Sequence, residues 1–269
     1  MDLELHAQVA VVVGAARGIG RAIAQAFAAE GAHVALIDRQ PAVAETARGL
    51  GEKYAGQFLH LVADATDYVA MQQAAEEVER GLGPVRHVVY AAGVGSGKTG
   101  FPFWNIEPQA WDRVWRVNVL GAVHTIHAFT PPMLPRRQGT FLFLASVAGQ
   151  IGSQTDPPYS AAKAALINFA QCAAKDLAPY HIRVNSLNPG MVDTELSQAI
   201  WAASNHHLPP EERPDYETWA TEKLKRLVPL NRWQEPEDIA AMAVFVASAR
   251  ARNVTGQAIN VDGGFVMRS

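Results

Sequence analysis

The chain has 269 residues, of which 49% are hydrophobic and 18% are charged, and its formal net charge is −3. This length suits one α/β domain of the larger kind, and the charge gives no reason to expect nucleic acid or an anionic membrane as a partner. No apolar run approaches membrane-spanning length, and the first residues, MDLELHAQ, are unlike a signal or transit peptide. The single cysteine, Cys172, cannot form an internal disulfide, so we expect a reducing cytoplasm and a Cys172 that packs within its helix.

The first predicted element is a buried strand near residues 8–13, followed by a glycine-rich turn. The turn contains Gly14, Gly18 and Gly20, and the amphipathic pattern RAIAQAFAAEG follows it. Glycine permits a tight turn with positive φ, and a helix that starts there directs free N–H groups at an anion. The strand, turn and helix therefore predict a site for the pyrophosphate of a dinucleotide.

The next strand, near residues 33–37, ends at an acidic residue. Asp38 lies about 20 residues beyond the turn, where a carboxylate can accept hydrogen bonds from the adenosine ribose of NAD and would repel the 2′-phosphate of NADP. Arg17 and Arg39 favour the opposite choice, since both could reach a 2′-phosphate. We favour NAD and leave NADP as the alternative.

The remaining strands alternate with alanine-rich helices to the end of the chain. They are predicted near residues 57–62, 86–90, 139–145, 181–187 and 256–261. This alternation predicts an α/β fold with one doubly wound parallel sheet of about seven strands, flanked by helices. No linker or internal repeat divides the chain, so we expect residues 1–269 to form a single domain.

A serine, a tyrosine and a lysine carry the chemistry. Tyr159 and Lys163 are four residues apart and share one helix face, and Ser146 precedes Tyr159 by thirteen positions. A cation near a phenol lowers its pKa, so we expect Tyr159 to exchange a proton near neutral pH. A hydroxyl such as Ser146 can hold a carbonyl or alcohol oxygen beside that phenol.

With these residues and the glycine turn, nearly the whole chain resembles the short-chain dehydrogenase/reductase family. Further matching segments are LVADAT with Asp64, VYAAG with Gly93, RVNVLGA with Asn118, NSLNPG with Pro189 and Gly190, RWQEPEDIA, and VDGG. Two positions depart from the family's usual pattern: Val13 stands where Thr is common, and Tyr90-Ala91-Ala92-Gly93 lacks the usual Asn. Both departures put details of cofactor affinity in doubt and leave the proton-transfer residues intact.

The resemblance implies NAD(P)-linked oxidoreduction in a homotetramer. Tyr159 would be the general acid/base, Lys163 would lower its pKa and bind the nicotinamide ribose, and Ser146 would polarise the substrate oxygen. Asn118 would hold the active-site helix and a water that joins Lys163 to solvent. The implied cofactor-binding residues are Gly14, Arg17, Gly18, Ile19, Gly20, Asp38, Arg39, Asp64, Ala65, Ala91, Gly93, Asn118, Tyr159, Lys163, Pro189, Gly190, Val192 and Thr194.

Substrate choice is expected in the segments that follow the strands, because ligands bind beyond the carboxyl ends of an open parallel sheet. These segments are residues 94–104, 147–158 and 195–228, and the last resembles the family's mobile lid. Besides Ser146 and Tyr159, the residues that we expect to contact substrate are Trp104, Gln150, Trp201 and Arg213.

The polar lid favours a small hydroxylated substrate such as a sugar, sugar acid or polyol, oxidised with NAD. A 3-oxoacyl-thioester reductase has a similar pattern and is the main alternative. A non-catalytic NAD-binding sensor is a third, weakened by the intact set of Asn118, Ser146, Tyr159 and Lys163. The nine histidines show no metal-ligand pattern, so we expect no metal site.

Overall fold

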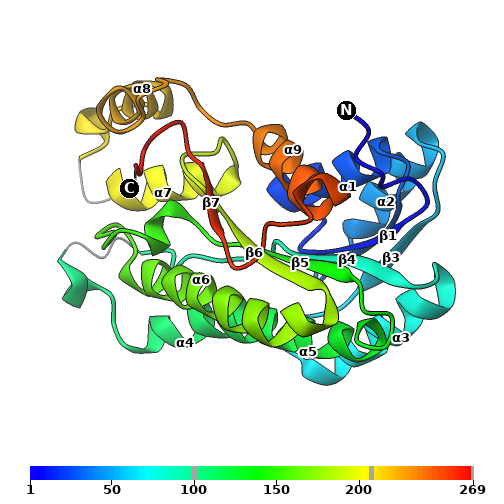
Figure 1. The fold of residues 1–269 in the computed structure, drawn as a ribbon. Helices are drawn as coiled ribbons and strands as arrows, with labels where there is room; N and C mark the ends of the chain where they lie inside the picture. The colour runs from blue at the N-terminus through cyan, green and yellow to red at the C-terminus, as the bar shows by residue number, and fades with distance from the viewer. Residues whose placement is uncertain (99–101, 206–208, 268–269) are drawn as a thin grey trace.

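All seven strands belong to one parallel sheet in this computed structural model, which describes residues 1–98, 102–205 and 209–267. The strand order is β3-β2-β1-β4-β5-β6-β7 (Figure 1). The strands are β1 (Val9–Val13), β2 (His33–Asp38), β3 (Phe58–Val62), β4 (Val85–Tyr90), β5 (Gly139–Leu144), β6 (Ile182–Pro189) and β7 (Ala258–Val261). Each predicted strand is present, with its ends shifted by at most two residues, and the doubly wound parallel sheet is confirmed.

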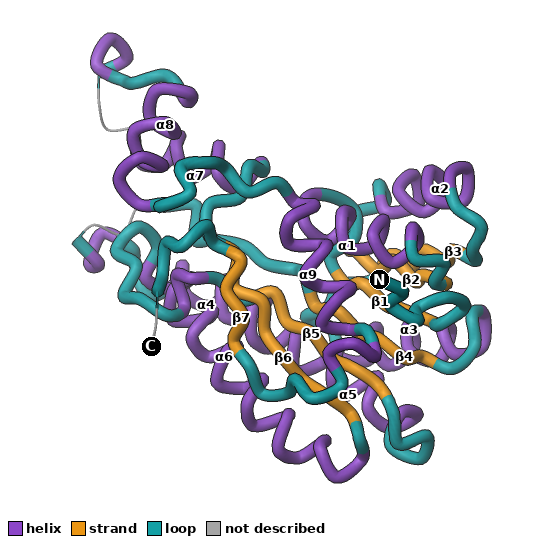
Figure 2. Tube along the Cα trace, turned by 45° about the horizontal axis from the view of Figure 1, so that its top comes forward, coloured by secondary structure: helices purple, strands orange, loops and turns teal. Residues whose placement is uncertain are grey.

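Helices cover both faces of the sheet, as Figures 1 and 2 show. On one face lie α1 (Gly18–Ala29), α2 (Val43–Lys53) and α9 (Pro236–Ala247). On the other lie α3 (Tyr68–Gly81), α4 (Gln109–Trp115), α5 (Gly121–Met133) and α6 (Pro157–Leu177). Between α4 and α5 the chain forms a π-helical turn, η2 (Arg116–Leu120).

The sheet is buried on both faces because its central strands are continuous apolar runs. Every residue of β1 and of β5 is buried, as is typical of parallel strands covered on both sides. Alanines along α1 and α9 leave little side-chain bulk between the helices and the sheet, so both helices pack closely.

The predicted lid forms two helices beyond the carboxyl edge of the sheet. These are α7 (Glu195–Asn205) and α8 (Tyr216–Leu227), with the short 3₁₀ turn η5 (Pro210–Glu212) between them. In Figure 1 they stand apart from the sheet, close to the end of β7. Residues 206–208 of the predicted lid and residues 99–101 of the predicted substrate loop lie outside the described residues.

One prediction about the core is wrong. Cys172 lies on α6, but its side chain is exposed rather than packed within the molecule. Within the described part of the chain, no helix is long and apolar enough to cross a membrane.

Candidate active site

The candidate functional residues gather at the carboxyl edge of the sheet. Gly14 follows β1, Asp38 ends β2, Gly93 follows β4 and Ser146 follows β5. The strand order reverses between β1 and β4, and such a switch point leaves a crevice that binds ligands in open α/β sheets.

Two glycines of the turn after β1, Gly14 and Gly20, have no room for a side chain. Gly14 has φ +88°, and a Cβ there would lie 2.6 Å from the backbone nitrogen of Ala92. A Cβ on Gly20 would collide with the Gly14 carbonyl. Gly18, at φ +55°, is less crowded, because a Cβ there would lie 3.9 Å from the nearest atom, in the Thr194 side chain. The turn therefore brings bare backbone to the wall of the crevice.

The N-terminus of α1 is free to bind an anion. No side chain caps it, and its first turn holds no acidic residue. Free N–H groups and the helix dipole attract phosphate at such an end. Together with the tight backbone turn at Gly14 and Gly20, this end fits the pyrophosphate of a dinucleotide.

Asp38 is fixed as a hydrogen-bond acceptor at the far end of the same crevice. Its Oδ2 accepts from the backbone N–H of Ala16 at 3.0 Å, and its Oδ1 accepts from that of Gln40 at 2.9 Å. Each carboxylate oxygen keeps a lone pair that can accept from a ribose hydroxyl. Arg17 and Arg39 are both exposed beside it.

The other predicted cofactor residues lie along the same edge. Asp64 follows β3, and its Oδ1 accepts from the backbone and the hydroxyl of Thr66, both at 2.8 Å. Gly190 follows β6 and donates to the Gln234 side chain at 2.9 Å, while Val192 forms a β-bridge with Gln234. The remaining residues of this group, all at or just beyond strand ends or in the glycine turn, are Ile19, Ala65, Ala91 and Pro189.

Close packing brings Ser146 to Tyr159. Ser146 begins the 3₁₀ turn η3 (Val147–Gly149), and a Cβ on Gly149 would lie 2.6 Å from the carbonyl carbon of Lys163. The turn thus rests on the backbone of α6, one helical turn after Tyr159. Ser160 secures it by donating to the Ala148 carbonyl at 2.6 Å. As a result the Ser146 hydroxyl lies close enough to the Tyr159 phenol to lower its pKa.

The prediction that the phenol is acidified is wrong. Burial raises the pKa of Tyr159 to about 12, the Ser146 hydrogen bond lowers it by less, and the charge of Asp156 adds to the increase. Lys163 Nζ lies 5.4 Å from the Tyr159 ring centroid and donates to the Leu144 carbonyl at 2.7 Å. Burial also lowers the pKa of Lys163 to about 7, so its full charge is absent at neutral pH.

Asn118 and Lys163 approach the same point from two elements. A Cβ on Gly93 would lie 3.0 Å from Asn118 Oδ1 and 3.2 Å from Lys163 Nζ. The Asn118 amide donates to the carbonyls of Val94 at 2.8 Å and Val114 at 2.9 Å. Its Oδ1 is buried and has no partner among the described residues, so it can accept one more hydrogen bond inside the site.

Sequence reasoning missed the contribution of Asp156. Its Oδ2 accepts from the Ser96 N–H at 2.7 Å and its Oδ1 from the Tyr159 N–H at 3.3 Å, so it ties the loop after β4 to the start of α6. Burial raises the pKa of this carboxyl. An Asp followed by Pro-Pro is a helix-start pattern, and that signal was available in the sequence.

Of the four further predicted substrate residues, two line a cavity of about 650 Å³ on the outer side of the 147–158 loop. Trp104 is 70% exposed there, and Gln150 also lines it. Gln150 exchanges two hydrogen bonds with Asn260 of β7, at 2.8 and 2.9 Å, which gives it a structural partner. Tyr159 is not among the described residues that line this cavity.

The other two predicted substrate residues belong to the lid. The Trp201 indole donates to the Pro214 carbonyl at 3.1 Å, and its ring packs edge-on against Tyr216. Arg213 is exposed between η5 and α8. Substrate contact by these four residues stays a prediction.

Comparisons with known proteins agree with this geometry. A family model described as enoyl-(acyl carrier protein) reductase matches residues 14–266. The galactitol 2-dehydrogenase (L-tagatose-forming) of Cereibacter sphaeroides is 36% identical, over 96% of this chain and 94% of that protein. The 3-oxoacyl-(acyl-carrier-protein) reductase of Thermotoga maritima is 30% identical, over 98% of this chain and all of that protein. The structure of L-sorbose reductase from Gluconobacter frateurii with NADPH and L-sorbose superposes with a TM-score of 0.90, at 31% identity over 100% of both chains.

Proposed function

The chain belongs to the short-chain dehydrogenase/reductase family, and we propose that it transfers a hydride between NAD and a sugar, sugar acid or polyol. The observation that carries the reaction class is the convergence of four side chains at one edge of the sheet. The Ser146 hydroxyl acts on the pKa of Tyr159, while Lys163 and Asn118 approach each other at Gly93. The proposal takes residues 1–269 as one catalytic domain with residues 195–228 as the lid.

Each of these residues has a distinct task in the proposed reaction. Bound NAD(P) supplies the hydride acceptor or donor. Tyr159 gives a proton to the substrate oxygen in reduction and takes it back in oxidation. Ser146 orients that oxygen by hydrogen bonding beside the phenol. Lys163 and the free Oδ1 of Asn118 hold the inner end of the proton path.

A hydroxylated substrate is favoured by the relatives and by the lid. Two of the similar proteins act, by name, on galactitol and L-sorbose. The described lid residues include exposed polar side chains such as Glu211, Glu212 and Arg213. Such groups can bind a compound that carries several hydroxyls.

The preference for NAD rests on Asp38. Its carboxylate is buried, and backbone amides fix its position, so it cannot turn away from a 2′-phosphate. A phosphate beside this carboxylate would meet an unfavourable like-charge contact. The similar L-sorbose reductase, by contrast, was crystallised with NADPH.

The test is a steady-state panel of polyols, sugars, sugar acids and 3-oxoacyl thioesters, each with NAD(H) and NADP(H). We expect the highest kcat/KM for a polyol or sugar with NAD(H). Preference for an acyl thioester with NADPH would overturn the substrate and cofactor assignments. It would instead support a 3-oxoacyl reductase, which the similarity to the Thermotoga maritima enzyme favours as the second candidate.

The reaction class itself is tested by Tyr159→Phe. This variant removes the proton donor and leaves the ring, so we expect turnover to fall by about 10²–10⁴-fold while cofactor affinity changes little. Cofactor binding is followed by fluorescence titration. Tyr180→Phe is the matched control, because Tyr180 is 39% exposed and lies outside the site. Near-wild-type turnover of Tyr159→Phe would contradict the mechanism and leave an NAD-binding sensor as the better explanation.

We also propose a cytoplasmic homotetramer. The helices α4 and α5, with the η2 turn between them, present large apolar side chains to the surface, with Trp115 40% and Leu120 36% exposed. Burial of these side chains against second copies would remove apolar area from water. Light scattering coupled to size-exclusion chromatography tests this, and a monomer at micromolar concentration would contradict it.

A further inference from the structure

A second cavity opens at the amino edge of the sheet, opposite the candidate active site. It has a volume of about 450 Å³ and lies where β4, β5 and β6 begin and where the chain leaves α9. Because all strands are parallel, a strand of six residues, about 20 Å long, separates this edge from the cofactor crevice. A ligand here would therefore not compete with the dinucleotide.

The lining of this cavity is strongly cationic. Four arginines reach it from four different segments: Arg86 from β4, Arg137 from the turn before β5, Arg183 from β6 and Arg252 from the turn after α9. Among the described residues that line it there is no Asp or Glu. The cavity thus concentrates positive charge that no lining carboxylate balances.

Two of the four guanidinium groups are already held by the protein. Arg183 donates to the carbonyls of Val254, Ala247 and Ser248 at 2.9–3.1 Å, and so binds the C-terminal end of α9. Arg137 donates to the Pro179 carbonyl at 2.7 Å. Neutral carbonyls of this kind orient the charges without cancelling them.

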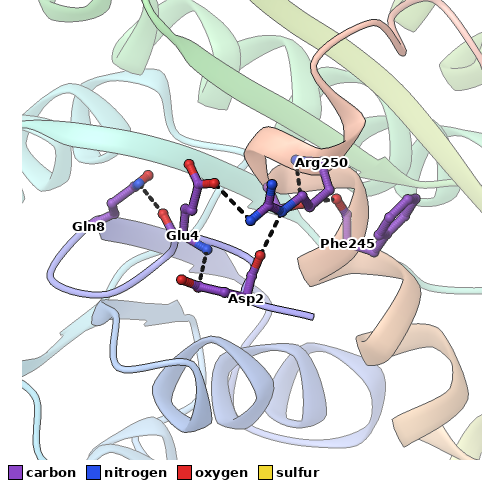
Figure 3. A network of polar contacts seen from close by, with 6 residues as sticks. Asp2, Glu4, Gln8, Phe245 and Arg250 are labelled. Carbon is purple, nitrogen blue, oxygen red and sulfur yellow. Dashed lines mark hydrogen bonds and ion pairs between the residues drawn. The ribbon is translucent and has the colours of Figure 1, made fainter.

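The other two guanidinium groups have no partner. The side chains of Arg86 and Arg252 make no hydrogen bond or ion pair with another described residue. Arg250, two positions before Arg252, differs from these two arginines because it has a counter-ion. It forms an ion pair at 2.9 Å with the carboxylate of Glu4, as Figure 3 shows. Arg86 is partly buried, and a buried charge without a counter-ion is costly.

The pKa values of two of these arginines are lowered by burial. Burial lowers the pKa of Arg183 to about 10, and repulsion from Arg86 adds to the decrease. Burial alone lowers the pKa of Arg86. No carboxylate contributes to either shift, whereas Glu79 raises the pKa of Arg136 on the neighbouring α5–β5 connection.

The floor of the cavity is a rigid neutral network. His87 Nε2 lies 2.7 Å from Gln8 Oε1, and its Nδ1 lies 2.8 Å from Thr140 Oγ1. Because an amide oxygen can only accept, Nε2 donates its proton to Gln8, and Nδ1 accepts from Thr140. The arginines are therefore presented around a fixed base rather than on a mobile loop.

We propose that this cavity is a binding site for a small multivalent oxyanion, which Arg86 and Arg252 bind directly while Arg137 and Arg183 complete the positive field. Guanidinium groups match the oxygens of phosphate and carboxylate in a two-pronged geometry. The bound anion would join the starts of β4, β5 and β6, and would stabilise the folded state by an amount that grows with the logarithm of its concentration above Kd. This proposal is independent of the substrate and cofactor proposed above.

The test is calorimetric titration of the full chain with inorganic phosphate, pyrophosphate or citrate, at constant ionic strength and with saturating reduced cofactor. The cofactor blocks the phosphate-binding end of α1, so that binding there cannot be mistaken for the new site. We expect pyrophosphate to bind and to raise the melting temperature. A stronger response to phosphates than to citrate would identify a phosphoryl ligand, and the reverse would identify a polycarboxylate.

The decisive variant is Arg86→Gln/Arg252→Gln, which removes two guanidinium groups that make no hydrogen bond or ion pair with another described residue. We expect it to bind the best anion at least about tenfold more weakly, with turnover in anion-free buffer equal to wild type. The matched control is Arg80→Gln/Arg113→Gln, which makes the same charge change on exposed helix surfaces and should bind like wild type. Absence of binding to the wild type, or equal losses in both double variants, would overturn the proposal.

Discussion

At the scale of single residues, Tyr90 shows how an unusual side chain supports the candidate site. It stands where the short-chain dehydrogenase/reductase pattern usually has Asn, and its hydroxyl donates to the Val117 carbonyl inside the π-helical turn η2. The same turn carries Asn118. A Cβ on Gly121 would collide with this hydroxyl, so the start of α5 is shaped around it. Tyr90 is thus a positioning residue for Asn118.

We therefore predict that Tyr90→Phe destabilises the protein by about 1–3 kcal/mol, because a buried carbonyl loses its donor. We also expect kcat to fall while cofactor affinity is retained, because Asn118 is less well fixed. Urea unfolding and steady-state kinetics measure the two effects. Tyr180→Phe, which removes an exposed hydroxyl, should change neither. A Tyr90→Phe variant with lowered stability but unchanged kcat would limit Tyr90 to a structural role.

The Tyr159 phenol makes a second prediction at this scale. With a pKa near 12 it is protonated at neutral pH and is ready to act as an acid in ketone reduction. Alcohol oxidation needs the deprotonated form, whose fraction rises with pH. We expect kcat/KM for oxidation to increase through the alkaline range, beyond the ordinary phenol pKa of about 10, while reduction stays flat near neutrality. An oxidation profile that levels off near pH 7 would show that Lys163 acidifies the phenol after all.

The sequence was sufficient to predict that Tyr159 and Lys163 lie together, but not their protonation. The spacing of Tyr159 and Lys163 indicates a shared helix face, and the structure has them on α6. The pKa depends on burial by segments distant in the chain, which the spacing does not report. Lys163 also donates to Leu144 of β5, a contact that forms only when α6 packs on the sheet.

At the scale of elements, Tyr216 connects the two helices of the proposed lid. The Tyr216 hydroxyl lies 2.6 Å from Ser197 Oγ on α7 and donates to Asp193 at 3.2 Å. Its ring packs against Trp201, Trp219 and Trp233, with centroids 6.1–6.3 Å away. Tyr216 therefore joins α7, α8 and the segment before α9.

We predict that Tyr216→Phe raises KM for the substrate by up to roughly tenfold, because it loses polar contacts worth about 1 kcal/mol and keeps the ring stack. Tyr216→Ala, which also loses the stack, should raise KM further and expose the lid to limited proteolysis. Cofactor affinity should stay close to wild type in both. An unchanged KM in Tyr216→Ala would show that the lid does not control substrate binding.

The elements themselves were largely predictable, because apolar β-branched runs and amphipathic helices are local patterns. All seven strands and the helix after the glycine turn are where the sequence places them. The π-helical turn at Arg116–Leu120 has no such pattern, since it results from Tyr90 and the fit of α5 against the sheet. The internal role of Trp201 in the lid was equally hidden, because it depends on Pro214 and Tyr216.

At the scale of the whole molecule, the parallel sheet separates two kinds of chemistry. Its carboxyl edge gathers the glycine turn, Asp38 and the proton-transfer residues, and its amino edge gathers four arginines around a neutral histidine. Motif spacing predicted the residues at the carboxyl edge. The arginine cluster at the amino edge was not predicted, because Arg86, Arg137, Arg183 and Arg252 are isolated in sequence and come together only through the order of the strands.

The buried histidine at the amino edge makes stability depend on pH. Burial and repulsion from Arg86 and Arg183 lower the pKa of His87 from 6.5 to about 3. Between these values the unfolded chain binds a proton that the folded protein does not. The contribution of the neutral imidazole to the free energy of unfolding is therefore fully present above about pH 6.5 and is lost as the pH falls towards 3.

We predict that His87→Gln lowers the free energy of unfolding at pH 7, because the contacts to Gln8 and Thr140 change, but flattens its decline on acidification. The quantity to compare is the difference in urea-unfolding free energy between pH 7 and about pH 5, in the absence of multivalent anions. His60→Gln is the control, because His60 is exposed on the edge strand β3. A decline in His87→Gln as steep as in the wild type would mean that other groups, such as carboxylates, cause the acid sensitivity. A flatter one would identify the neutral imidazole as the pH-sensitive support beneath the arginines.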